Sequence, residues 1–203
     1  NVYRISKSTH SFQEIMQVGL ECIGNLDDYA IYEVLTLAAE SLAQISPDYI
    51  LDISQLDIVQ RVLDSLDVET EVRQLLLKCI GEKNTSGIRE LCRKAGAAEA
   101  PMELLCRLVG AGGAPGGTIR MLRNEPLSGN FRRELDQLER IAALLEDSPL
   151  CGHIHLDFSV INDMNYYNGI VFSGFVNGIP NSVLSGGQYG RLMRRMGHRT
   201  EAI

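Results

Sequence analysis

Strand-like segments occur at both ends of this chain, and a long helical stretch separates them. The early segments are 1–6, 14–23 and 49–53, and the late ones are 153–158, 166–176 and 183–185. Because strands must pair their backbone groups, the late strands have to complete a sheet that the early ones begin. This pattern predicts an α+β fold with an antiparallel sheet and a mostly helical insertion. We expect the first part of the α+β domain at 1–65, the insertion at 66–150 and the second part at 151–203.

Helical signals divide the chain further. Apolar residues recur at helical spacing up to Ile45 after the acidic start at Asp27, and Ser54 is placed to cap a helix that runs to Leu63. The glycine-rich stretch 110–117 lacks the Gly-Lys-Ser/Thr ending of a phosphate-binding loop and is interpreted as a flexible connection. An amphipathic helix is expected over 130–146.

Composition excludes several classes of protein. The net charge of -7 over 203 residues disfavours a broad nucleic-acid surface, and the short basic run 191–199 is interpreted as a solvated helix face. No apolar run is long enough to span a membrane and the start does not resemble a signal peptide, so a cytoplasmic location is expected. The five scattered cysteines are interpreted as buried free thiols, and no metal site is expected.

Two groups of residues could line a pocket for a small ligand. Gln17 and Glu21 would share one face of a strand, and the late segments supply the pair 166–167, the glycines 186–187 and Tyr189. Amide and carboxylate oxygens suit an ammonium or imidazole, and glycines allow close backbone approach. From the pattern alone, solvent exposure of the early pair and core packing of the tyrosines are the simpler explanations, so both interpretations remain open at this point.

Taken together, these segments resemble the histidyl-tRNA synthetase-like class II catalytic domain. Residues 2–4 and 14–24 are similar to the arginine-bearing strand of the family's second motif and to its return strand. Residues 157–172 resemble the histidine-specific strand, and 185–189 resemble the glycine-rich corner that follows it. The helical stretch lies where the family carries an insertion. The resemblance implies a class II aminoacyl-tRNA synthetase-like antiparallel sheet flanked by helices.

The resemblance also implies roles for individual residues. Gln17 would meet the α-ammonium of histidine and Glu21 would accept from its imidazole. Arg4 matches the arginine that holds the ATP α-phosphate in active synthetases and is expected to be vestigial here. The implied histidine-binding set is Gln17, Glu21, Tyr166, Tyr167, Gly186, Gly187 and Tyr189.

Departures from the family pattern bear on catalysis. Active synthetases have an arginine before the paired tyrosines, where this chain has Asn162, and an acidic residue where it has Ser6. The corner contains Gln188 and Gly190 in place of arginine and aspartate. A fixed guanidinium stabilises charge that develops at the α-phosphate, and losing one such donor costs about a hundredfold or more in rate. We therefore expect no catalytic residue and no cofactor.

A retained histidine pocket without ATP chemistry resembles the family branch that regulates short-form ATP phosphoribosyltransferase, the entry step of histidine biosynthesis. That branch implies L-histidine as effector and a hetero-oligomer of a catalytic subunit with a synthetase-like homodimer, without membrane or tRNA. The alternatives are a divergent histidyl-tRNA synthetase and a scaffold that only mediates protein contacts. The family's first and third motifs would lie outside residues 1–203, so a fragment of a longer protein is expected.

Overall fold

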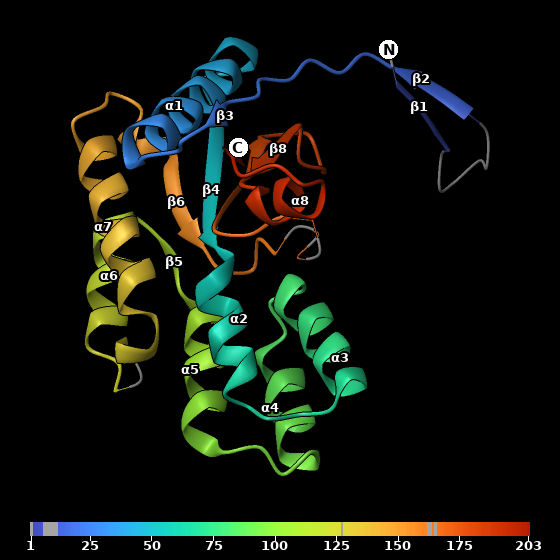
Figure 1. Ribbon diagram of the computed structural model, residues 1–203, viewed down its shortest axis with the longest axis vertical. Coiled ribbons are helices and arrows are strands. Elements are labelled where there is room, and N and C mark those ends of the chain that lie inside the picture. The colour runs from blue at the N-terminus through green and yellow to red at the C-terminus, as the bar shows by residue number, and fades with distance from the viewer. Residues whose placement is uncertain (1, 6–11, 127, 162–163, 165) are drawn as a thin grey trace.

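A computed structural model of the chain describes residues 2–5, 12–126, 128–161, 164 and 166–203, without the side chains of residues 4 and 13 (Figure 1). The strands are β1 Val2–Ile5, β2 Phe12–Ile15, β3 Ile23–Gly24, β4 Tyr49–Gln55, β5 Gly112–Gly113, β6 Ile154–Asp157, β7 Ile170–Val176, β8 Leu184–Gly187 and β9 Glu201–Ala202. The helices are α1 Asp28–Ile45, α2 Leu56–Asp64, α3 Thr70–Gly81, α4 Thr85–Lys94, α5 Glu99–Gly110, α6 Pro115–Arg123, α7 Arg132–Glu146 and α8 Gly190–Arg195. Short 3-10 turns occupy Ser128–Phe131 and Cys151–His153.

A five-stranded sheet in the order β5-β6-β4-β7-β8 forms the centre of the molecule. The early strand β4 lies between the late strands β6 and β7, so early and late strands share a sheet as predicted, but the early strands β1 and β2 pair only with each other. The pairing of β4 with β6 is parallel, whereas the other neighbours in this sheet are antiparallel. The α+β class is confirmed, and the one parallel pair makes the sheet mixed. The short strands β3 and β9 pair with each other beside it.

Helix α1 covers one face of the sheet. Its N-cap is Asp27, whose Oδ1 accepts the Ala30 N–H at 2.8 Å, and its buried stripe includes Leu35 and Leu42. A Cβ added at Gly174 of β7 would lie 2.6 Å from Leu42 Cδ1, so the absence of a side chain there lets the helix approach the strand. Helix α7 packs along α1, and α6 lies next to β6 (Figure 1).

The helical insertion is attached through α2 and returns through α7. Helix α2 is capped by Gln55, whose Oε1 accepts the Asp57 N–H at 3.1 Å, so the predicted cap at Ser54 was wrong. The glycine-rich stretch is not a flexible connection, because Gly112 and Gly113 pair with β6 and Pro115 begins α6. A proline at the first helical position fits this start. The expected boundaries at residues 66 and 150 stay a prediction.

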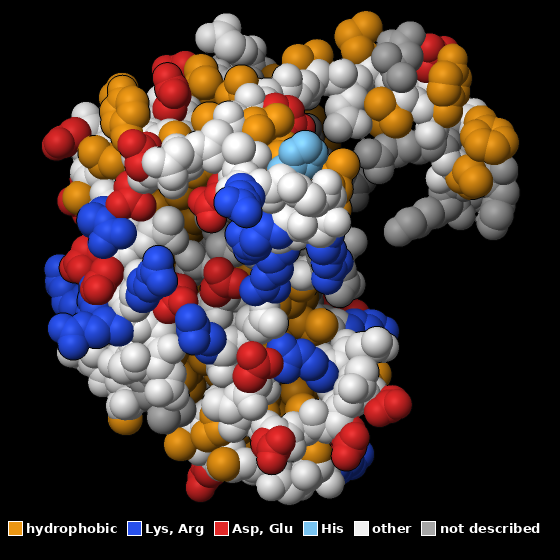
Figure 2. All heavy atoms as spheres, viewed as in Figure 1, with side chains coloured by type: hydrophobic (Ala, Val, Ile, Leu, Met, Phe, Trp, Pro, Cys, Tyr) orange, Lys and Arg blue, Asp and Glu red, His pale blue; other side chains and the backbone are white. Residues whose placement is uncertain are grey.

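The first hairpin extends from the body as an arm. β1 pairs with β2 in antiparallel fashion, but β2 ends at Ile15 and 16–22 is irregular, so the strand predicted over 14–23 was too long. Apolar side chains along the arm are exposed, for example Phe12 at 76% and Met16 at 84%. Figure 2 shows these orange side chains spread along the arm, whereas basic side chains gather over the region of α8. The described part of the hairpin is thus joined to the body through the irregular segment that follows it.

Two further expectations concern thiols and membranes. All five cysteines are free, but only Cys92 and Cys106 are fully buried and Cys151 is exposed, so their expected burial holds in part. No helix among the described residues is long and apolar enough to cross a membrane.

Candidate functional site

One cavity collects every residue of the predicted histidine-binding set. Its volume is about 520 Å³, and it lies between the irregular segment after β2, helix α1, and the corner that contains β8. Its lining includes Gln17, Glu21, Tyr166, Tyr167, Gly186, Gly187 and Tyr189. A cavity of this size suits a small organic ligand. The two groups of residues that the sequence singled out therefore meet in space.

A hydrogen bond links the two groups directly. The hydroxyl of Tyr189 donates to Oε2 of Glu21, across 168 residues of chain. Burial raises the pKa of Tyr189, and the hydrogen bond and negative charge of Glu21 raise it further. The phenol therefore stays protonated and acts as a donor at neutral pH.

Three tyrosine rings form an aromatic wall. The rings of Tyr166 and Tyr167 meet edge to face with centroids 4.6 Å apart, and Tyr166 lies 5.6 Å from Tyr189. Aromatic pairs at these separations attract one another, and a flat heteroaromatic ring can pack against the same surfaces. Part-exposed tyrosines gathered at a cavity fit the binding interpretation better than core packing.

The two glycines of the corner have a packing role in addition to the one expected. A Cβ at Gly186 would lie 2.4 Å from Cζ of Phe172, and one at Gly187 would lie 2.6 Å from Cγ1 of Val171. These glycines make room for side chains of β7. Both glycines also border the cavity, and the expectation that they bring the backbone close to a ligand stays a prediction.

Sequence reasoning missed the wall that α1 contributes. Val34, Leu37, Ala38 and Ser41 line the cavity at helical spacing. The sequence analysis used the apolar spacing of this segment only to predict a helix. Leu37 and Ser41 lie outside that apolar spacing and are exposed in the structure beside the buried stripe.

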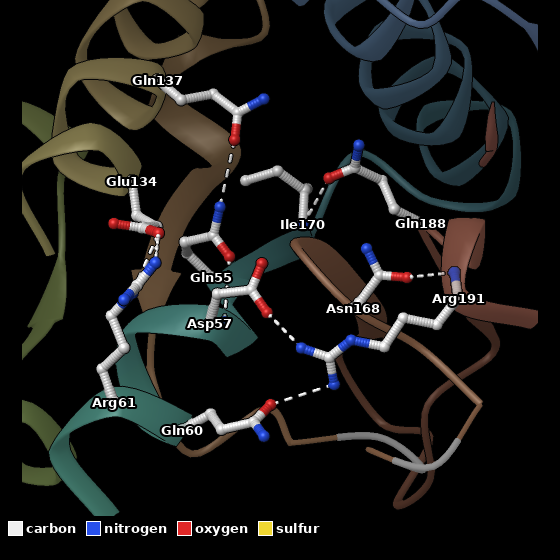
Figure 3. Close-up of polar contacts among 10 residues, drawn as sticks. All are labelled: Gln55, Asp57, Gln60, Arg61, Glu134, Gln137, Asn168, Ile170, Gln188 and Arg191. Atoms are coloured by element: carbon white, nitrogen blue, oxygen red, sulfur yellow. Dashed lines mark hydrogen bonds and ion pairs between the residues drawn. The ribbon is translucent and has the colours of Figure 1, made fainter. Parts of the chain in front are cut away.

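Of the two arginines considered for ATP chemistry, the structure describes the side chain of Arg191 but not that of Arg4. Arg4 lies in β1 and its side chain is outside the described part, as are Ser6 and Asn162. The Arg191 guanidinium donates to Asp57 at 2.9 Å and to Gln60 at 3.0 Å, both on α2 (Figure 3). Among the described residues, no group of three or more His, Cys, Asp or Glu could hold a metal ion.

A second cavity of about 630 Å³ lies on the opposite face of the sheet. Its lining includes Asp52, Asp157 and Ser173, and it is bounded by the α3–α4 connection, from which Lys83 Nζ reaches Asp157 Oδ2 at 2.6 Å. Asp157 also accepts the Ser159 hydroxyl at 2.7 Å. These internal contacts join the helical insertion to the sheet.

Comparison with known proteins confirms the expected family. The family model described as histidyl-tRNA synthetase matches residues 1–203. This chain belongs to that family. The ATP phosphoribosyltransferase regulatory subunit of Thermoanaerobacter sp. (strain X514) is 29% identical over 209 residues, covering 100% of this chain and 53% of the relative. The chain spans about half the length of the curated relatives it matches.

Solved structures of the family share the fold. A regulatory subunit/histidyl-tRNA synthetase from Bacillus halodurans superposes with a TM-score of 0.77 at 24% identity, over 90% of this chain and 48% of that one. A chain of the ATP phosphoribosyl transferase (HisG:HisZ) complex from Thermotoga maritima superposes with a TM-score of 0.74 at 18% identity, over 100% of this chain and 69% of that one. The class II synthetase-like fold is thereby confirmed, and the curated relatives confirm the expected resemblance to regulatory-subunit paralogues.

Proposed function

We propose that this chain provides the histidine-binding part of a non-catalytic regulatory subunit, which controls a separate catalytic subunit of ATP phosphoribosyltransferase. The names of the curated relatives support a regulatory role, and the Thermotoga maritima structure that shares the fold is a complex of two kinds of subunit. Regulation of this kind requires that histidine bind two states of the assembly with different affinities.

The hydrogen bond from Tyr189 to Glu21 is the observation that carries the proposal. It occupies one oxygen of the carboxylate and leaves the other to accept an imidazole N–H. Gln17 supplies an amide oxygen for the α-ammonium, and the tyrosine rings flank the imidazole. The polar groups named here thus correspond to the α-ammonium and the imidazole of histidine.

The loss of catalysis follows from the charges of the site. Asn162 is neutral where an active synthetase has an arginine, and the first arginine of the basic run is engaged with α2. A synthetase would need a substitute cation to stabilise the developing charge at the ATP α-phosphate. The Arg191 guanidinium instead donates to Asp57 and Gln60 on α2.

Calorimetry on the full-length protein tests the binding role. We expect L-histidine to bind, and Glu21→Gln to weaken binding about tenfold or more, because the ligand would lose a hydrogen bond to a charged acceptor. Ser41→Ala is the matched control: it borders the same cavity, but its hydroxyl donates to the Leu37 carbonyl at 2.7 Å. Absence of histidine binding at millimolar concentration would refute the role.

Two activity assays separate regulator from enzyme. Adding the protein to a purified catalytic subunit should make phosphoribosyl transfer responsive to histidine, and the Glu21→Gln variant should lose that response. Histidine-dependent ATP–pyrophosphate exchange should be absent. Robust exchange would instead establish a divergent histidyl-tRNA synthetase.

A further inference from the structure

The two chain segments that carry the pocket tyrosines are bonded to each other. The Asn168 N–H donates to the Gln188 carbonyl at 2.8 Å, and the Gln188 N–H donates to the Ile170 carbonyl at 2.8 Å. The Gln188 side chain is buried and its Oε1 accepts the Ile170 N–H at 2.7 Å. Tyr167 and Tyr189 therefore extend from one hydrogen-bonded corner.

Arg191 fastens this corner to α2, as Figure 3 shows. Its backbone N–H donates to Asn168 Oδ1 at 2.9 Å. Its guanidinium donates to Asp57 Oδ1 at 2.9 Å and to Gln60 Oε1 at 3.0 Å, two side chains that lie one turn apart on α2. The Gly169 carbonyl also accepts the Leu56 N–H at 2.8 Å. One side chain thus spans the tyrosine corner and the helix that leads into the insertion.

Helix α2 is held from its other side by α7. Gln55 Nε2 donates to Gln137 Oε1 at 3.1 Å, and Arg61 donates to Glu134 Oε1 through Nε at 3.0 Å and Nη2 at 2.7 Å (Figure 3). Helix α7 packs on α1, which lines the cavity. A displacement of the corner would therefore be transmitted to α2 and to the helices of the insertion.

We propose that Arg191 is a positioning residue of the tyrosine pocket and couples its occupancy to α2. This inference rests on the proposed histidine-binding function. Tyr189 stands two residues before Arg191, at the start of the short helix α8. With the guanidinium bound to α2, the Tyr189 ring is held in place to face Glu21. Ligand packed against that ring in turn holds α8 and α2 together.

The test combines binding with amide exchange. Arg191→Ala and Asp57→Asn should each weaken histidine binding about tenfold, within the range of typical coupling between sites. The double variant should bind no more weakly than Arg191→Ala alone, because removal of the guanidinium already removes its contact with Asp57. Arg194→Ala on the same helix is the matched control, because the Arg194 guanidinium lies 3.9 Å from the Glu201 carboxylate and does not contact α2 in any described ion pair. The histidine affinity of this variant should stay within about twofold of wild type.

Hydrogen exchange gives a readout that a purely structural role would not change. Saturating histidine should slow exchange of α2 amides in the wild type and in Arg194→Ala, and should have no such effect in Arg191→Ala. Arg191→Lys keeps the positive charge but lacks the forked guanidinium, so this variant should bind histidine with intermediate affinity. It preserves the test if the alanine variant does not fold.

The outcomes separate the two proposals. A wild-type protein that does not bind histidine would overturn the proposed function, and this inference with it. A wild type that binds histidine, together with Arg191 variants that keep its affinity and its ligand-dependent protection of α2, would overturn the coupling alone. Additive losses in the double variant would also overturn it.

Discussion

Gly186→Ala tests whether packing against β7, rather than approach of a ligand, requires glycine at the corner. Gly186 pairs with Phe172 in the register of β7 and β8. An added Cβ would lie 2.4 Å from Cζ and 2.9 Å from Cε2 of that ring, which is 5% exposed as a residue. Real Cβ atoms do not approach other heavy atoms so closely, so the ring or the strand has to move.

The cost follows from overpacking. Forcing extra atoms into a packed site costs about 1–3 kcal/mol, and each kcal/mol lowers the melting temperature of a chain of this size by about 2–4 °C. We expect Gly186→Ala to melt about 2–12 °C below wild type by circular dichroism. Urea unfolding of the same variant should give a lower midpoint with an unchanged slope.

A double-mutant cycle identifies the cause. Phe172→Leu removes the ring atoms that the new methyl group would meet, so the double variant should be more stable than the sum of the single changes by about 0.5–3 kcal/mol. Gly19→Ala is the control, because it borders the same cavity and, apart from its chain neighbours, no described residue has an atom within 4 Å of its added Cβ. Additive losses, or an unchanged melting temperature for Gly186→Ala, would refute the packing argument.

Three further predictions concern the corner and the second cavity. Gln188→Ala should cost about 1–3 kcal/mol in urea unfolding, because the buried Ile170 N–H loses its side-chain acceptor; a smaller loss would mean that water replaces it. Lys83 has φ +54°, a backbone conformation that glycine adopts more easily than alanine. In urea unfolding, Lys83→Gly should therefore be about 1 kcal/mol more stable than Lys83→Ala, although both variants lose the ion pair with Asp157. Equal midpoints would show that the backbone is unstrained. Burial raises the pKa of Asp52 above its usual 3.8, and the charge of Asp157 raises it further. The folded chain therefore retains a proton that the unfolded chain releases, so the free energy of unfolding falls as pH rises from about pH 4 through the folded pKa. Asp52→Asn should therefore be more stable than wild type at pH 7, with a difference that vanishes below about pH 4; a difference independent of pH would contradict this.

Local patterns sufficed for several elements. The acidic start and apolar spacing of α1 predicted a helix to Ile45, and Asp27 is its N-cap. The strand signals on both sides of the helical stretch predicted that early and late strands would share a sheet, and β4 does lie between β6 and β7. These inferences hold because helical periodicity and capping depend on residues a few positions apart.

The predictions failed where pairing partners decide the structure. Alternating polar and apolar residues suggested a strand up to Ile23, but 16–21 has no partner strand among the described residues, and 16–22 is irregular. Gly112 and Gly113 form a strand only because the edge of β6 is beside them. A strand is stabilised by its neighbour, which local sequence does not identify.

For the candidate site, too, the sequence indicates some features and only the fold decides others. Residue types alone specify the chemical groups of the pocket, and the family resemblance grouped Gln17 and Glu21 with the tyrosines. The folded chain was needed to place Glu21 against Tyr189, 168 residues away, and Arg191 against Asp57, 134 residues away. Folding also explains why Phe172 needs the glycine at 186, because that requirement comes from packing across strands. The chemistry of a side chain belongs to each residue, whereas contacts over such separations exist only once the sheet and its helices have brought the segments together.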